Sequence, residues 1–267
     1  MSTALDDVKY QVAVANRILA ELGFATGVLA SLGHASMRVP SAPDQFVVKG
    51  RGYKIDALAA MRPEDMVVCD LEGNKLDGPP GSTQCFEVKM HSCIYKARPD
   101  VQAVVHLHPR FAVVMSILGG DLVPMCQEGT QPGSSLHRWA LGERLPLYPH
   151  AKTIQTEEEG MDVARALGSY PAILLQGHGA TTVGGNLEEA VMTMAFLEEQ
   201  ARMNWYAYCA AGPNHPHITR EQIQEMVGRP KLAELPHFRE VLAERGNEPR
   251  VGGTWQFYAD KVSRELR

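Results

Sequence analysis

Apolar residues recur along this chain at two spacings, which predict helices and strands in mixed order. Between Leu5 and Leu22 they return every three or four residues until Gly23, the pattern of an amphipathic helix. Short apolar runs bounded by glycine, proline or charged residues instead predict strands. The other predicted helices are Thr83–Lys96, Phe111–Leu118, Glu157–Leu167 and Asn186–Cys209, and the predicted strands are Gly33–Arg38 (entered through a turn), Phe46–Val48, Met66–Cys69, Val101–Leu107 and Ala172–Gln176.

Segments rich in glycine and proline separate these elements. Asp70–Gly81 and most of Asp121–Tyr148 are expected to be loops, and Pro213, Pro216, Pro230 and Pro236 divide the C-terminal part of the chain into short helical pieces. The chain has no internal repeat and no low-complexity tract. Mixed helices and strands of this kind predict a single α/β domain.

Composition and charge exclude several classes of protein. The 267 residues can bury one large core, and 45% hydrophobic with 21% charged residues is ordinary for a soluble globular protein. A net charge of −5 with no run of Lys or Arg argues against nucleic acid or an anionic membrane as the main partner. The N-terminus lacks the pattern of a secretory signal, and no stretch approaches about 20 uncharged apolar residues. Five cysteines without CxxC spacing predict reduced thiols in a cytoplasmic protein.

Three histidines and one glutamate carry the strongest indication of chemistry. His106 and His108 flank a leucine in a predicted strand, where residues two apart point to the same face. His178 lies far downstream between two glycines, after another apolar run, and Glu87 precedes the histidine strand. Imidazoles that converge in this way are typical of a divalent metal site.

Each of these residues also has an ordinary explanation when it is considered alone. Glu87 could ligate the metal, transfer a proton or simply face solvent, and paired strand histidines often form only polar surface. His91 lies one helical turn past Glu87 on the same predicted face, so it either touches the site or is a packed or capping histidine. The joint pattern is more specific, because all three strand-end histidines lie where α/β folds build their sites.

Over Leu5 to Ala211 the chain resembles the class II aldolase/adducin family, in the fuculose-phosphate aldolase type of fold. The matching residues are Glu87, the run Val104-Val-His-Leu-His108 and the run Leu174-Leu-Gln-Gly-His-Gly179. The resemblance implies a three-layer α/β/α fold around a central, mainly antiparallel sheet. It also implies that His106, His108 and His178 bind one divalent ion per subunit (zinc, manganese, iron or cobalt), and that Glu87 is the acid/base residue and ligates the resting metal.

The chain departs from the sugar-phosphate aldolases at the positions that hold phosphate in that family. His34 stands in place of an asparagine, Arg51 in place of a serine, and Cys85 and Phe86 in place of a serine pair. The aldolase tyrosine that donates a proton from a neighbouring subunit corresponds to Gln127 here. A flat, anionic and partly apolar substrate fits these replacements better than a sugar phosphate does.

A substrate carboxylate is the expected ligand of Arg51. Its planar guanidinium can donate two parallel hydrogen bonds, a charge-assisted contact of roughly 1.5–3 kcal/mol. Lys49 or His34 would help to hold the carboxylate, while Phe86 would pack against a ring. The alternative is that Lys49 and Arg51 are ordinary loop charges.

These replacements resemble the branch of the family that decarboxylates hydroxylated aromatic dicarboxylates. The expected function is metal-dependent conversion of 3,4-dihydroxyphthalate to protocatechuate in aromatic catabolism, with Glu87 transferring the proton. His34 is the second candidate, as a proton donor or as a clamp on the carboxylate that leaves. A dipositive ion would supply several kcal/mol of charge stabilisation for breaking the carbon–carbon bond.

Two other functions remain open from the sequence. One is an aldolase or epimerase that acts on a sugar or hydroxy acid, and the other is a non-catalytic, adducin-like interaction module. Adducin-type relatives lack the metal residues, whereas this chain has all four. The resemblance further implies a homo-oligomer, expected as a cyclic tetramer, in which residues 1–212 form the family domain. Residues 213–267 are expected to form a helical extension that packs on this domain or on a neighbouring subunit.

Overall fold

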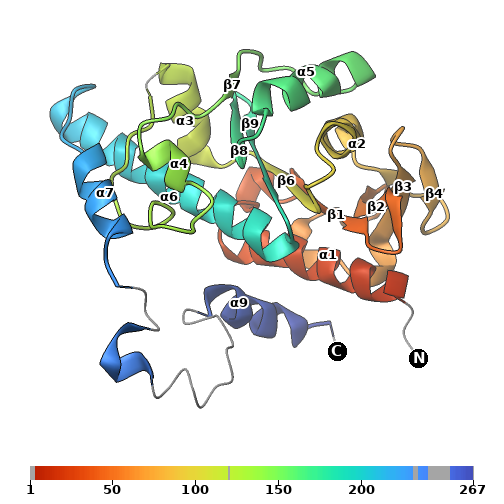
Figure 1. Ribbon diagram of the computed structural model, residues 1–267. Coiled ribbons are helices and arrows are strands. Elements are labelled where there is room, and N and C mark those ends of the chain that lie inside the picture. Colours follow the sequence, from red (N-terminus) through yellow and green to blue (C-terminus); the bar gives the residue numbers. More distant parts are fainter. Residues whose placement is uncertain (1–3, 120, 231–233, 240–252, 267) are drawn as a thin grey trace.

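An open, mostly antiparallel sheet lies at the centre of the structure, a computed structural model that describes residues 4–119, 121–230, 234–239 and 253–266 (Figure 1). Its strands follow the order β4-β3-β2-β1-β6-β9-β8-β7, and β5 pairs with β2 beside this row. All pairings are antiparallel except that of β7 with β8. The strands are β1 (His34–Val39), β2 (Ala42–Arg51), β3 (Met66–Asp70), β4 (Lys75–Asp77), β5 (Thr83–Gln84), β6 (Ala103–Leu107), β7 (Leu147–Tyr148), β8 (Ala172–Leu175) and β9 (Gly179–Gly184).

Helices cover both faces of this sheet. Figure 1 shows α2 and α5 on one side of it and α1 with α6 on the other, and α3 packs against α6 and β8. The helices are α1 (Ala4–Glu21), α2 (Val88–Ala97), α3 (Arg110–Leu118), α4 (His137–Ala140), α5 (Glu157–Leu167), α6 (Leu187–Ala211), α7 (Arg220–Val227) and α9 (Thr254–Ser263), with short 3-10 turns at Gly27–Leu29, Leu58–Ala60 and Pro63–Asp65. The three-layer α/β/α fold expected from the resemblance is confirmed.

Two hydrophobic cores result from the alternation of side chains along the strands. In β6, Val105 and Leu107 point into the core beneath α1 and α6, whereas Val104 points into the core beneath α2 and α5. Because residues two apart share a face of a strand, His106 lies on the same face as Val104. The candidate site therefore belongs to the α2/α5 side of the sheet.

Most of the predicted elements are present, but several differ in extent and some strands were missed. The helix predicted at Thr83–Lys96 begins only at Val88, because Thr83 and Gln84 pair with β2 as a short strand. The strand predicted at Phe46–Val48 is longer, since β2 runs from Ala42 through Arg51, and β4 and β7 lie in segments that were expected to be loops. Strand β9 was not predicted, because its glycines and threonines form no apolar run.

Of the C-terminal residues that the structure describes, those in α9 pack against α1 of the same chain. Val262 is buried in the core beneath α1, and Arg17 of α1 pairs with Glu265. The boundary between residues 212 and 213 as a domain limit stays a prediction. No helix among the described residues is both long and apolar enough to cross a membrane.

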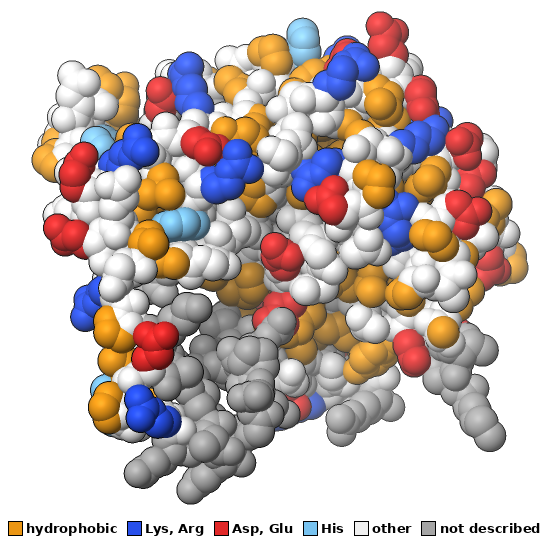
Figure 2. Space-filling view, viewed as in Figure 1, with side chains coloured by type: hydrophobic (Ala, Val, Ile, Leu, Met, Phe, Trp, Pro, Cys, Tyr) orange, Lys and Arg blue, Asp and Glu red, His pale blue; other side chains and the backbone are white. Residues whose placement is uncertain are grey.

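The molecular surface carries charges of both signs. Figure 2 shows acidic and basic side chains interspersed on one face, in keeping with the small net charge of −5. The five cysteines are free thiols, and three of them are buried.

Glu198 of α6 holds the start of α3, immediately after the strand that carries His106. Its two carboxylate oxygens accept hydrogen bonds from the backbone N–H groups of Phe111 and Ala112, at 3.0 and 2.9 Å. Burial nevertheless raises the pKa of Glu198 to about 7. Since the folded state holds the proton more strongly than the unfolded chain, this residue favours folding at low pH.

The free energy of unfolding is expected to depend on pH through Glu198. The contribution is present below about pH 4.5, the ordinary pKa of the group, and is lost as the pH rises through about 7. Relative to Glu198→Gln, the wild type should lose roughly 3 kcal/mol over this range. Urea denaturation at several pH values measures the difference. Glu199→Gln is the matched control and should keep the wild-type profile, whereas parallel profiles for wild type and Glu198→Gln would contradict the assignment.

Candidate metal centre

His106 takes its position from the register of the three central strands. In the pairing of β1 with β6 it lies opposite His34, and in the pairing of β6 with β9 it lies opposite Thr181. The side chains of these three residues therefore share one face of the sheet, and all three are buried. Gly33 allows β1 to start this close to β6, because a Cβ there would come within 2.7 Å of the carbonyl oxygen of His106.

A short hydrogen-bonded chain sets the tautomer of His106. Thr181 donates its hydroxyl proton to the sulfur of Met90, at 2.9 Å. The Thr181 oxygen must then accept from the Nδ1–H of His106, 3.1 Å away. This leaves the lone pair of Nε2 directed into the site, the state that a metal-ligating imidazole requires.

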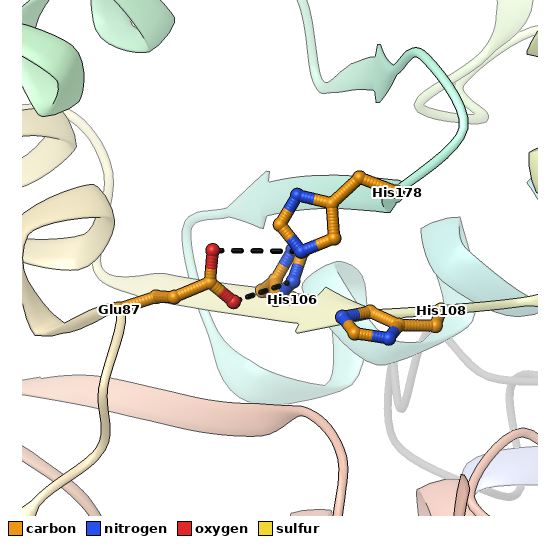
Figure 3. Close-up of side chains that lie close together, drawn as sticks. All are labelled: Glu87, His106, His108 and His178. Atoms are coloured by element: carbon orange, nitrogen blue, oxygen red, sulfur yellow. Dashed lines mark ion pairs between the residues drawn. The ribbon is translucent and has the colours of Figure 1, made fainter. Parts of the chain in front are cut away.

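His108 and His178 approach His106 from a strand end and from the turn before β9. The ring centres are 5.2 Å apart for His106 and His108, 5.0 Å for His106 and His178, and 4.8 Å for His108 and His178 (Figure 3). Gly179 makes this approach possible, since a Cβ at this position would lie 2.2 Å from the carbonyl oxygen of Leu107. The three imidazoles thus surround one small volume.

Glu87 completes this group from the opposite side. The sequence predicted Glu87 to lie within a helix, but it is the residue just before α2. Its Oε2 lies 3.1 Å from Nε2 of His106 and its Oε1 3.5 Å from Nε2 of His178, as Figure 3 shows. Oε1 also accepts a hydrogen bond from the backbone N–H of Ile154 at 3.0 Å, which fixes the carboxylate from the loop before α5.

The electrostatics of this group suit a cation. Burial alone would raise the pKa of Glu87, but the surrounding imidazoles, His106 foremost, lower it well below its usual range. Burial, together with His106 and His178, lowers the pKa of His108 to about 3. At neutral pH the group therefore offers an ionised carboxylate and at least one neutral imidazole.

Unpaired nitrogen atoms support the same interpretation. Nε2 of His106 and Nε2 of His108 are buried without a hydrogen-bond partner, although Nε2 of His106 lies 3.1 Å from Oε2 of Glu87. Such atoms are costly unless something binds them. Glu87, His106, His108 and His178 each present one donor atom, all within 4.8 Å of one another, so these residues fit a divalent ion.

His34 borders this group without joining it. Its ring centre lies 5.4 Å from that of His106, and burial, followed by the influence of His91 and His106, lowers its pKa well below 6.5. The sequence left His91 as either a site contact or a packed or capping histidine. It is fully buried, and its Nε2 lies 2.7 Å from Nδ1 of His34. His91 is thus a packed residue that contacts a candidate catalytic residue.

Two of the predicted substrate-binding residues contact each other. The guanidinium of Arg51 stacks over the ring of Phe86 at 4.1 Å, and Phe86 is 66% exposed directly beside Glu87. Arg51 also faces Asp56, with 3.9 Å between Nε and Oδ2. Lys49 is only 1% exposed in β2, which rules out an ordinary loop charge, and burial lowers its pKa.

Within one chain, Gln127 does not belong to this group of residues. It is exposed in the segment between α3 and α4, where its side-chain oxygen accepts a hydrogen bond from Gln131 at 3.4 Å. Other residues of the site were missed from the sequence, namely Thr181, Met90, Ser36, Tyr95 and Ile154. Strand alternation could have placed Thr181 beside His106 only if the pairing of β6 with β9 had been known.

Comparison with known proteins agrees with this architecture. Residues 10–205 match the family model described as Class II Aldolase and Adducin N-terminal domain. The chain belongs to this family. A protein of Arthrobacter keyseri named 3,4-dihydroxyphthalate decarboxylase is 31% identical over 206 residues, 75% of this chain and 79% of that protein. A protein of the same name from Rhodococcus jostii (strain RHA1) is 31% identical over 215 residues, 79% and 84% of the two chains.

Solved structures of the family share the fold. L-fuculose 1-phosphate aldolase from Glaciozyma antarctica PI12 superposes with a TM-score of 0.70 at 24% identity, covering 100% of this chain and 92% of that one. L-fuculose-1-phosphate aldolase from Thermus thermophilus has a TM-score of 0.60 at 29% identity, covering 79% and 99%. Family membership and the decarboxylase relatives support a lyase activity on a small molecule.

Replacing His108 with alanine is expected to abolish binding of a divalent ion, because one of three convergent imidazoles is removed while the sheet stays intact. Metal analysis of the purified variant, with circular dichroism to verify folding, measures the effect. His217→Ala, an exposed histidine, is the control and should retain the metal content of the wild type. Equal metal content in wild type and His108→Ala would contradict this ligand set.

Proposed function

We propose that this protein is a divalent-metal-dependent decarboxylase of a hydroxylated aromatic dicarboxylate, most concretely 3,4-dihydroxyphthalate, which would yield protocatechuate. Two relatives at 31% identity carry the name of this activity. The observation that carries the proposal is the pairing of two different surfaces in one site. A group of imidazoles and one carboxylate, suited to an ion, includes Glu87, and the preceding residue, Phe86, packs beneath the guanidinium of Arg51.

Two cations on β2 could hold an anionic substrate. Arg51 and Lys49 lie two residues apart, with Asp56 facing Arg51 and both Asp56 and Asp65 acting on Lys49. Burial has already removed most of the water around Lys49, so the cost of desolvating this cation is met on folding. A planar ring with adjacent carboxylates could stack with the exposed face of Phe86 while Arg51 donates two hydrogen bonds.

The residues that would hold the ion are His106, His108 and His178, with Glu87 as a fourth ligand in the resting state. A bound zinc, manganese, iron or cobalt ion would supply positive charge to stabilise electron density on a substrate oxygen next to the scissile bond.

Glu87 is the residue best suited to move the proton. The resting carboxylate is ionised, and in the proposed mechanism it first accepts the proton of the ring hydroxyl beside the leaving carboxylate. It then delivers this proton to the ring carbon that bears the carboxylate. The carbon–carbon bond breaks, its electron pair returns to the ring, and carbon dioxide leaves. One proton from solvent restores the hydroxyl, which balances the exchange of a carboxylate for hydrogen.

A second candidate is an aldolase that acts on a sugar phosphate or hydroxy acid. It is supported by the 29% identity with the Thermus thermophilus aldolase structure. Against it stand His34, Arg51, Cys85 and Phe86, which replace small polar residues that the family uses for phosphate.

The proposal includes a cytoplasmic homo-oligomer, expected as a cyclic tetramer. From the resemblance we expect the site to lie near a subunit interface, with Gln127 entering from a neighbouring copy. Light scattering that finds only monomers would contradict this part.

The experiment that tests the function is carbon dioxide release from 3,4-dihydroxyphthalate by metal-loaded protein. Product chromatography should identify protocatechuate, and removal of the ion with a chelator should stop the reaction. Cleavage of L-fuculose 1-phosphate, without release of carbon dioxide from several ortho-hydroxy dicarboxylates, would establish the aldolase instead.

Arg51→Ala should weaken substrate binding by about 10- to 150-fold and leave the metal content unchanged, since a charge-assisted contact is worth roughly 1.5–3 kcal/mol. Arg51→Lys should restore only part of this affinity, because an ammonium group cannot form the planar two-bond contact. Steady-state kinetics measure KM and kcat for both variants, with the exposed Arg62→Ala as a control. A normal KM in Arg51→Ala would refute the carboxylate contact.

A further inference from the structure

Four buried polar side chains form a continuous hydrogen-bonded chain that leads from the site into the core beneath α2. Nδ1 of His34 lies 2.7 Å from Nε2 of His91, and Nδ1 of His91 lies 2.6 Å from Oγ of Ser36. Oγ of Ser36 in turn lies 2.8 Å from the hydroxyl of Tyr95. His34 and Ser36 come from one face of β1, whereas His91 and Tyr95 lie one turn apart on α2.

This chain is sealed from solvent over its whole length. His91 and Ser36 are fully buried, Tyr95 is 1% exposed, and Phe46 lies against the rings of both His91 and Tyr95. Burial lowers the pKa of His91 to about 3, so this imidazole is neutral and carries a single N–H. With water excluded, the protons along the chain must be ordered so that every donor meets an acceptor.

The phenol of Tyr95 determines which order is satisfied. Burial raises its pKa, so the phenol keeps its proton and needs an acceptor for it. Among the hydrogen bonds of the described residues, Ser36 is the acceptor available to it.

The order of the remaining protons follows from this step. Tyr95 donates to Ser36, and Ser36 donates to Nδ1 of His91. His91 then carries its hydrogen on Nε2 and donates to Nδ1 of His34, so the proton of His34 resides on its own Nε2. In the reverse order, the Tyr95 hydroxyl would be buried without an acceptor, which is unfavourable.

We propose that Tyr95, Ser36 and His91 are positioning residues that fix His34 as the Nε2–H tautomer, a neutral hydrogen-bond donor for a carboxylate of the substrate. The inference rests on the proposed function for the identity of the acceptor. It assigns His34 the clamping role rather than that of a base or a metal ligand. It also disfavours binding of a second ion at His34, Cys85 and His91, although their donor atoms lie within 4.8 Å of one another. Both nitrogens of His91 are already committed to hydrogen bonds.

The tautomer can be observed directly in the full-length protein labelled with nitrogen-15 at histidine, with and without added zinc. Two-bond proton–nitrogen NMR spectra distinguish the two neutral forms of each imidazole, and the spectrum of His34→Asn assigns the signals. The wild type should show His34 protonated on Nε2. Ser36→Ala and Tyr95→Phe break the order of protons, so both should shift His34 toward the Nδ1–H form.

Binding of phthalate to the zinc-loaded protein provides the functional measurement. Ser36→Ala and Tyr95→Phe should weaken it by about tenfold, since each lowers the population of the donor without touching the ligand. Phe46→Leu is the matched control, because it loosens the packing around His91 and leaves every hydrogen bond of the chain in place. It should lower the melting temperature, yet keep the His34 tautomer and the affinity for phthalate.

The outcomes separate this inference from the proposed function. If His34 carries its proton on Nδ1 in the wild type, or if Ser36→Ala and Tyr95→Phe both leave its tautomer unchanged, the inference is overturned even when carbon dioxide is released. If the tautomer shifts as expected but phthalate affinity stays the same, His34 is not the carboxylate donor. A shifted tautomer with weaker phthalate binding supports the inference, whatever the final substrate of the enzyme.

Discussion

The register of three adjacent strands is the constraint on which the whole site depends. Pairing of β1, β6 and β9 aligns His34, His106 and Thr181 in one row across the sheet, on the face covered by α2. A shift of one residue in either pairing would send a side chain of this row to the opposite core. Glycines at the strand ends permit the close approach that this register requires. The site therefore depends on these glycines as well as on its histidines.

The local pattern of apolar residues was sufficient to predict those helices whose structure depends mainly on their own segment of the sequence. Leu5–Leu22 and Asn186–Cys209 were predicted to within a few residues, and Asn186 caps its helix by accepting a hydrogen bond from the backbone of Glu189. The HxH spacing likewise predicted that His106 and His108 would share a face. The structure brings them together with His178 and Glu87, and their function as ligands remains a prediction.

Pairing between distant segments could not be predicted in the same way. Residues Thr83 and Gln84 have the composition of a helix start, but they pair with β2 as a short strand. Lys49 seemed to belong to a loop until β2 was found to extend past it. The partners of the site histidines have no motif of their own, because a serine, a tyrosine or a threonine acquires its importance only from the residue that folding places beside it.

The contact between Thr181 and Met90 has a consequence for how this protein tolerates change. Leucine has nearly the volume of methionine, and cores usually accept the exchange at little cost. Here the sulfur is the acceptor that directs the threonine proton away from His106. With leucine at position 90 the hydroxyl would be free to rotate and donate to the imidazole, which would transfer the ring proton to the nitrogen that faces Glu87. A buried apolar residue thus influences the tautomer of the central histidine, and shape alone would not reveal it.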